Sequence, residues 1–361
     1  MTSEQLAGAA LMLLFLADIF LTILYARAGT GLLAPWWDRA VWMLIQAISR
    51  TFGRRRGAVL SFTGPIIVVS LIVFWSLGLT VGAALIIQPE LGTAIRPSSG
   101  ATPTDFVTAL LVAGNSLSIV GGGDYSPHTS GTRLLYLFNS LVGASVLSLV
   151  LSYLLQVYSA LRERNALAFA IDLMTDGTGD AAEMLARLMP GGEAGDAVSE
   201  LGNLVRSLAA TKEAHHFYPL LFYFRFNEPR YAVSRFCFVL LDLTTLIDSA
   251  LDRRRYGALR DSAPVASLHR GALLLLQTLD ENLPTSQARQ CDGAEAWRAR
   301  QSYAAASKVL GRQGIAIAPD GIDAYVDARR TWEPLVRGVA PTLGYTLDTI
   351  ERRAVEERSS A

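Results

Sequence analysis

Three long apolar stretches dominate the first half of the chain. Residues 5–26 carry one charged residue, Asp18, whereas residues 57–89 and 134–161 carry none. About 20 apolar residues form a helix long enough to cross the roughly 30 Å hydrocarbon core of a membrane. The pattern therefore predicts three transmembrane helices. They cover residues 5–27, 58–88 and 132–160, to within a few positions.

After residue 160 the pattern becomes that of a soluble helical domain, with apolar residues at helical spacing between turn-forming residues. The predicted helices cover residues 166–189, 197–210, 231–251, 264–279, 296–310 and 322–354. The most apolar piece, residues 217–250, contains charged residues such as Arg225 and Asp242, so it predicts a buried pair of core helices rather than a fourth span. The expected domains are a transmembrane domain over 1–160 and a helical domain over 161–361.

Composition supports this division. The mean hydropathy is +0.31, and 51% of residues are hydrophobic while only 18% are charged, which is typical of a membrane protein. The formal net charge is zero, so nothing indicates a nucleic-acid partner. The two cysteines, Cys237 and Cys291, lack metal-ligand spacing and are expected to be free thiols. The first stretch differs from a cleaved signal peptide because no basic residue precedes its long apolar core.

The arginines predict the orientation in the membrane. Six arginines and one acidic residue lie between the first and second spans, and Arg162 and Arg164 follow the third. Between the second and third spans, Glu90, Asp105 and Asp124 outnumber Arg96. Because positive loops stay in the cytoplasm, we expect the N-terminus outside and the C-terminal domain in the cytoplasm, as a multi-pass protein of the cell membrane.

The loop between the first two spans predicts an amphipathic helix at the membrane surface. Apolar residues recur there at helical spacing, with Arg39 and Arg50 between them. They are Leu32, Leu33, Trp36, Trp37, Val41, Trp42, Leu44, Ile45 and Ile48. Tryptophan-rich amphipathic helices lie in the interface between lipid and water. The helix serves either as an anchor or as a lever that transmits gating force.

The segment between the second and third spans predicts a re-entrant loop. Thr102-Pro103-Thr104-Asp105 has the composition of a helix start, with a hydroxyl cap, a proline at the first position and an acidic first turn. The helix would run to about Leu117, too short to span the membrane. The glycines of residues 118–124 then allow backbone carbonyls to line a pore, because glycine adopts dihedrals that other residues avoid. The pore helix and filter together are expected over about residues 103–124.

This loop resembles the pore of the potassium-channel family, the bacterial two-transmembrane and two-pore kind. The family pattern Thr-Thr-Val-Gly-Tyr-Gly-Asp, followed two residues later by proline, corresponds here to residues 118–124 and Pro127. The matching residues are Ser118, Ile119, Val120, Gly121, Gly122, Gly123 and Asp124. Gly143 lies where the family often has a hinge in its inner helix, although a close-packing role explains it equally well. The resemblance covers about residues 58–160.

The resemblance implies an all-α membrane protein with a re-entrant pore helix, assembled as a homotetramer in lipid. Residues 118–123 would form the selectivity filter, and Asp124 would lie at its outer mouth. The permeant ion would be K⁺ or another monovalent cation, without any further cofactor, and the protein would not be an enzyme. One loop per chain explains four subunits, because a filter needs about four loops around one axis.

Two residues depart from the family pattern. Ile119 replaces a threonine whose hydroxyl binds the innermost ion, and Gly122 replaces a tyrosine whose ring braces the filter. Both changes predict weak selectivity between K⁺ and Na⁺. An alternative is a non-selective or poorly conducting channel-like protein whose helical cytoplasmic domain acts in signalling or scaffolding.

Other polar residues have two interpretations each. Asp18, in mid-span, is either a sensor or a residue turned towards a neighbouring helix. His128, beside the loop, is either a pH-sensitive group at the mouth or a solvated side chain. In the helical domain, neither the loop at residues 176–180 nor the adjacent pair His215-His216 has the pattern of a metal site. The sequence predicts no ligand for residues 161–361.

Overall fold

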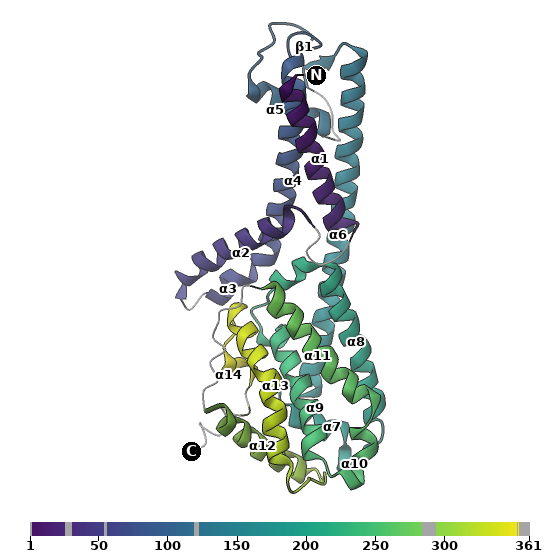
Figure 1. Cartoon of the computed structure of the whole chain (residues 1–361), viewed down its shortest axis with the longest axis vertical. Coiled ribbons are helices and arrows are strands. Elements are labelled where there is room, and N and C mark those ends of the chain that lie inside the picture. The colour runs from purple at the N-terminus through teal and green to yellow at the C-terminus, as the bar shows by residue number, and fades with distance from the viewer. Residues whose placement is uncertain are drawn as a thin grey trace. The chain divides into compact units, whose positions relative to one another are not determined.

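The computed structural model describes residues 2–25, 31–53, 56–118, 123–283, 294–351 and 353. The described chain is nearly all α-helical and contains one two-stranded sheet (Figure 1). It divides into two compact units. Unit 1 comprises Met1–Leu44, Pro65–Tyr158 and Phe217–Leu220, and unit 2 comprises Ile45–Gly64, Ser159–His216 and Leu221–Ala361.

Within the part of the chain that the structure describes, three helices are long and apolar enough to cross a membrane, which agrees with the number of predicted spans. They are α1 (Ser3–Ile23), α4 (Thr63–Ile87), which continues in the short turn η2 (Gln88–Glu90), and α6 (Ser130–Met174). The described residues also include the amphipathic helix α2 (Ala34–Arg50) and the shorter apolar helix α5 (Phe106–Leu117). The chain is therefore a multi-pass membrane protein.

The ends of two of these helices differ from the prediction. Residues before Thr63 form a separate short helix, α3 (Arg56–Ser61), so the second span begins later than expected. The third apolar stretch does not end its helix near residue 160, because α6 continues to Met174 as one helix of 45 residues. Residues 161–174 contain no glycine or proline and consist largely of helix-forming residues, so nothing interrupts the backbone where the charges begin.

Small residues let α1 and α4 lie in close contact. A Cβ added to Gly8 would lie 2.5 Å from the Gly82 carbonyl oxygen, and one added to Gly78 would lie 2.2 Å from the ring of Phe15. Phe15 also meets Phe74 edge to face, with ring centroids 5.1 Å apart. Glycines at such contacts are typical of helix packing inside membranes, where close backbone approach replaces hydrophobic burial.

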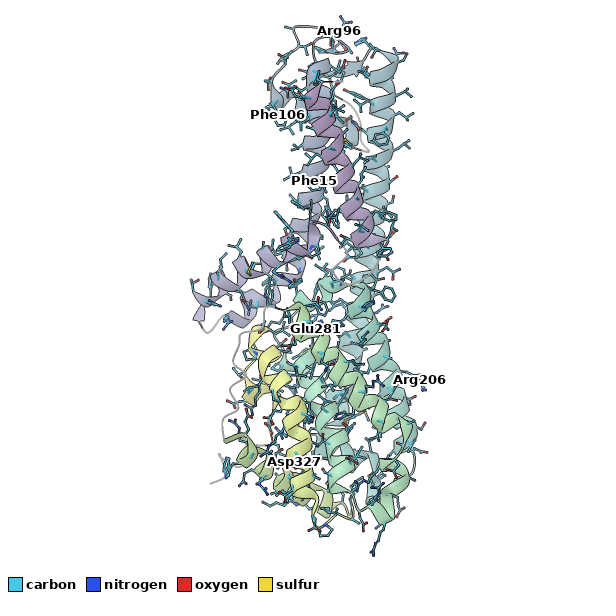
Figure 2. All side chains as sticks on the ribbon, viewed as in Figure 1. Phe15, Arg96, Phe106, Arg206, Glu281 and Asp327 are labelled. Atoms are coloured by element: carbon cyan, nitrogen blue, oxygen red, sulfur yellow. The ribbon has the colours of Figure 1, made fainter. Side chains whose placement is uncertain are left out.

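Unit 2 is built around α9 (Val233–Ala250), of which every residue except Asp248 is buried. The helices α7 (Ala181–Leu188), α11 (Ala263–Asn282) and α13 (Gly321–Thr342) pack against it, and α12 (Ala294–Arg312) packs on α7 and α13. The remaining helices are α8 (Ala197–Phe217), α10 (Arg253–Arg260) and α14 (Leu347–Ile350). Charged side chains such as Arg206, Glu281 and Asp327 lie on the exposed surface (Figure 2).

Two expectations for unit 2 were wrong in detail. Within residues 217–250 only α9 is a long buried α-helix, so the predicted helix pair is wrong. Prolines limit the chain before α9 to the short 3₁₀ segments η4 (Pro219–Tyr223) and η5 (Pro229–Tyr231). The last helix was predicted over residues 322–354, but α13 ends at Thr342. Two residues later, Gly344 has a φ of +75°, a left-handed conformation that glycine adopts readily and that ends the helix.

Buried ion pairs connect the helices of unit 2. Arg353 pairs with Asp180 and, at 2.9 Å, with Asp242, which also accepts a hydrogen bond from Tyr325 at 2.5 Å. Arg329 on α13 pairs with Glu333 at 2.7 Å. The neighbouring carboxylates raise the pKa of Arg353 despite its burial, so the charge stays on the guanidinium. These residues tie the end of the described chain to α7, α9 and α13.

Candidate functional site

The short helix α5 begins later than the sequence suggested. Asp105, not Thr102, caps it: the Asp105 carboxylate accepts hydrogen bonds from the Thr108 amide at 3.0 Å and the Thr108 hydroxyl at 2.8 Å. These bonds lower the pKa of Asp105 and keep its charge at the positive end of the helix. A carboxylate that reaches both donors satisfies the first turn better than a hydroxyl three residues earlier.

Small and aliphatic residues hold α5 against its neighbours in unit 1. Ala109, Val112 and Ala113 are buried and pack in one cluster with residues of α1 and α4. The α4 members are Ala83, Ala84 and Ile87, and Met12 comes from α1. Alanines on both helices allow their backbones to approach closely. The helix that precedes the glycine run is therefore fixed along its length.

A short sheet joins the segments before and after α5. Strand β1 (Ile95–Pro97) pairs antiparallel with β2 (Tyr125–Pro127), with Ile95 opposite Pro127. The Ser98 amide donates to the Asp124 carbonyl at 3.2 Å, and the His128 amide donates to the Ala94 carbonyl at 2.8 Å. Residues 124–128, which follow the glycine run, are thus tied to the segment that precedes α5.

The structure describes only the two ends of the predicted filter. Ser118 caps the C-terminus of α5, and its amide donates to the Gly114 carbonyl at 2.9 Å. Ile119, Val120, Gly121 and Gly122 lie outside the described residues. Gly123 has a φ of +124°, and a Cβ there would lie 2.6 Å from Asn115 Nδ2. Asp124 follows as an exposed residue.

Helix α6 contacts the last turn of α5 at two positions. Asn139, which is fully buried, donates from Nδ2 to Ser116 Oγ at 2.9 Å. One turn later, a Cβ added to Gly143 would lie 1.8 Å from the Leu117 carbonyl oxygen. Gly143 is therefore a close-packing residue in this structure, and its use as a hinge stays a prediction. The sequence analysis missed Asn139, although a polar residue within an apolar span was a sufficient reason to consider it.

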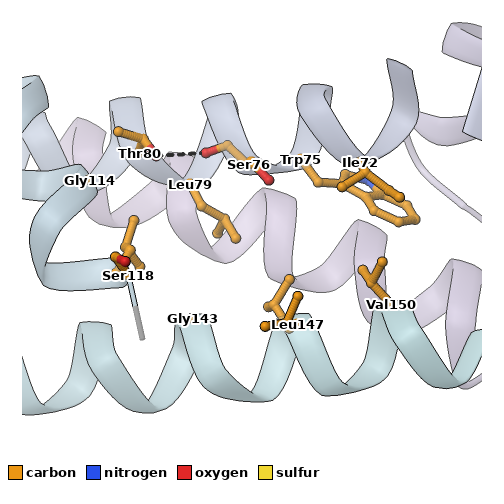
Figure 3. A pocket seen from close by; sticks show the side chains of 12 residues that line it. Ile72, Trp75, Ser76, Leu79, Thr80, Gly114, Ser118, Gly143, Leu147 and Val150 are labelled. Carbon is orange, nitrogen blue, oxygen red and sulfur yellow. Dashed lines mark hydrogen bonds between the residues drawn. The ribbon is translucent and has the colours of Figure 1, made fainter. Parts of the chain in front are cut away.

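A cavity of about 230 Å³ lies next to this contact, between α4, α5 and α6 (Figure 3). Its lining is mainly apolar, and its polar groups include Ser118 and Thr80, whose hydroxyl donates to the Ser76 carbonyl at 2.8 Å. The other lining residues are Ile72, Trp75, Leu79, Gly114, Leu117, Gly143, Val146, Leu147 and Val150. The predicted filter thus begins beside a mainly apolar cavity whose described lining residues include no charged side chain.

Asp18 has structural partners within unit 1. Its carboxylate accepts hydrogen bonds from the Leu33 amide at 2.7 Å, the Ala34 amide at 3.3 Å and the Trp75 indole at 2.7 Å. It is fully buried and caps the start of α2, which supports the interpretation that it turns towards neighbouring helices. Asp38 is also buried, and burial raises its pKa to about 8, with the Asp18 carboxylate as the second cause.

The remaining polar candidates lie apart from the loop or at its edge. His128 is exposed, 3.3 Å from the Ser126 hydroxyl. In unit 2, His215 is fully buried and bonded to the Thr211 carbonyl at 2.8 Å, and burial lowers its pKa to about 3. Among the residues that the structure describes, no three His, Cys, Asp or Glu side chains lie together as a metal site.

Residues 66–160 match the model of a protein family described as "Ion channel". The matched region includes α5, both strands and most of α4, and it confirms the resemblance that the loop indicated. No curated protein and no solved structure matches the chain. The match gives this region an ion channel domain, which indicates a channel rather than an enzyme.

Proposed function

We propose that the protein is a tetrameric, potassium-channel-like cation channel of the cytoplasmic membrane. One observation carries the proposal: α5 ends at Ser118, between two helices of spanning length, inside the region that matches the ion channel family. A short helix that ends within the membrane directs the negative end of its dipole towards the following loop. That arrangement favours a cation at residues 118–123, with Asp124 concentrating cations at the outer mouth.

The homotetramer follows from one pore loop per chain, because about four loops are needed to enclose an ion path. Large apolar side chains on the spanning helices, such as Leu13, Leu77 and Leu155, are more than half exposed in the single chain and are available to lipid or other subunits. Purified protein in mild detergent should have the protein mass of four chains of 39.0 kDa. A monomer or dimer would contradict the pore.

The proposed orientation places the N-terminus outside and the helical domain in the cytoplasm. Loops rich in arginine stay in the cytoplasm, and here arginines are concentrated in the first loop and directly after the third span. Accessibility labelling of tags at both ends should report opposite sides of the membrane. Two ends on the same side would exclude three spans with this pore loop.

Cation flux into vesicles that contain the purified full-length chain tests the function. We expect K⁺ flux in the wild type and its loss in Gly123→Val, because Gly123 has a positive φ and its Cβ position lies 2.6 Å from Asn115. A fully assembled wild type without flux would overturn the channel proposal and support a membrane-anchored signalling or scaffold protein.

Weak selectivity is the expected behaviour of the wild-type filter. Ile119 supplies no oxygen ligand, and Gly122 supplies no ring to brace the carbonyls. Ile119→Thr together with Gly122→Tyr should raise the K⁺/Na⁺ permeability ratio, measured as the reversal potential in a planar bilayer. Strong K⁺ selectivity in the wild type would show that residues 120–123 form a constrained cage without these groups.

A further inference from the structure

A chain of buried hydrogen bonds joins α6 to the last turn of α5. Asn139 Nδ2 donates to Ser116 Oγ at 2.9 Å, and Ser116 Oγ donates to the Ala113 carbonyl at 2.8 Å. Asn139 is 0% exposed and Ser116 is 6% exposed. The chain therefore reaches the backbone of α5 without passing through solvent. Its middle member, Ser116, lies two residues before Ser118, where the predicted filter begins.

A second contact on the same face of α6 reinforces the first. Asn139 and Gly143 are four residues apart, so they lie above one another on the helix surface. Gly143 meets the Leu117 carbonyl, whose oxygen would lie 1.8 Å from an added Cβ. Ser116 and Leu117, which immediately precede Ser118, thus rest on one face of α6.

An asparagine at this place needs an explanation, because α6 is apolar over residues 134–161. Burying an amide costs free energy unless its groups are hydrogen-bonded, and Asn139 Oδ1 has no hydrogen-bond partner among the described residues. A leucine could fill the same volume without that cost. The amide adds a directional contact. A hydrogen bond of defined length and angle restricts how the last turn of α5 can rotate or shift relative to α6, whereas an apolar contact does not.

We propose that Asn139 is a positioning residue for the pore, which sets the place of the filter through Ser116 and so contributes to the choice of permeant cation. This inference rests on the proposed channel function. The competing explanation is that the pair only holds two membrane helices together, as polar side chains commonly do. The two explanations differ in what a substitution changes, because helix adhesion affects stability alone.

The variants Ser116→Ala, Asn139→Leu and their double variant remove the bond, and Ser116→Thr keeps the hydroxyl. Ser70→Ala is a matched control in the same unit. Ser70 Oγ likewise donates to a carbonyl three residues earlier, Ile67, at 2.9 Å, and accepts from a side-chain N–H of another helix, Trp37 Nε1, at 3.1 Å. It differs from Ser116 in lying on α4 rather than on the pore helix.

Reversal potentials for Li⁺, Na⁺, K⁺, Rb⁺ and Cs⁺ in planar bilayers give the permeability sequence of each full-length variant. We expect both single variants to shift at least one permeability ratio by about two- to tenfold, the range that one net hydrogen bond supplies. The double variant should shift the ratio no further than the larger single variant, because both remove the same bond. Ser116→Thr and Ser70→Ala should retain the wild-type sequence.

Wild-type permeability ratios in Ser116→Ala and Asn139→Leu, with lower thermal stability, would overturn the inference and leave a helix-adhesion role. A wild type that carries no current would instead contradict the channel itself.

Thermal melting of the tetramer in K⁺ and in Na⁺ gives a second measurement that needs no conduction, since a cation that binds the folded filter raises the melting temperature. The difference between the two salts should shrink in Ser116→Ala and persist in Ser70→Ala. Should Asn139→Leu fail to assemble, Ser116→Ala alone decides.

Discussion

Replacing Gly143 with alanine tests how closely α6 lies against the end of α5. The new Cβ would lie 1.8 Å from the Leu117 oxygen, and real Cβ atoms essentially never come within 3.0 Å of another heavy atom, so the helices must separate locally by about 1.2 Å. Overpacking costs about 1–3 kcal/mol, and the clash here is with backbone rather than a flexible side chain, so we expect about 3 kcal/mol. The better helix propensity of alanine returns up to about 1 kcal/mol. The net loss is about 2 kcal/mol.

Thermal unfolding of the full-length protein in detergent measures this loss. Gly131→Ala, on the same helix with no atom within 4 Å of its added Cβ, is the control and should be neutral or slightly stabilising. Gly143→Ala should also reduce cation flux, because the displaced Leu117 directly precedes Ser118. Equal melting temperatures for the two alanine variants would show that α6 and α5 are not in contact at Gly143, and the packing argument would be wrong.

Three further predictions concern buried ionisable groups. Burial raises the pKa of Asp38 to about 8, above its unfolded value of 3.8, so ionising this carboxyl destabilises the folded protein. The free energy of unfolding of the wild type should fall by about 5 kcal/mol as pH rises from 4 to 8. Thermal melting at a series of pH values should show no such fall for Asp38→Asn. Burial lowers the pKa of His215 from 6.5 to about 3, so the free energy of unfolding should fall by a few kcal/mol as pH drops below 6.5. The melting temperature of His215→Gln should lack this contribution over the same pH range. Identical pH dependence in the wild type and the variant would refute the burial of His215. Arg353→Ala leaves the buried Asp242 carboxylate without its 2.9 Å partner and should lower the free energy of unfolding by about 3–5 kcal/mol. Arg330→Ala breaks an exposed pair and should lower it by under about 1 kcal/mol. Chemical denaturation of both variants beside the wild type measures the two losses.

The spans were predictable because charge is absent from them, but their ends were not. Hydropathy marks where apolar residues stop, whereas a helix stops only where its backbone is interrupted. At Arg162 the charges return without glycine or proline, so α6 continues to Met174. The apolar content of residues 217–250 correctly predicted a buried helix, α9, while Pro219 and Pro229 limited the earlier part of this stretch to short 3₁₀ segments.

At the candidate site, the short helix was predictable and its connections were not. The strands β1 and β2 are three residues each, too short for an alternating pattern to appear in the sequence. The Asn139–Ser116 bond joins residues 23 positions apart on different helices, and no local pattern encodes such a pair. The family motif predicts residues 118–124 as the filter and its mouth, but such a motif carries no information on the residues that hold the loop in place.

Contacts within unit 2 link the helical domain to the end of the third apolar helix and to the segment that leads into the second. Arg164, on the later part of α6, donates to the Leu221 and Phe224 carbonyls at 3.1 and 3.2 Å. The neighbouring Arg225 donates to the Gly57 carbonyl, on the segment that leads into α4. Residues 221–225 therefore bind α6 and also α3, the short helix that leads into α4. A rearrangement of residues 221–225 would change the bonds to α6 and to α3 together, so a stimulus that acts on the helical domain would reach the segment before α4 as well as α6.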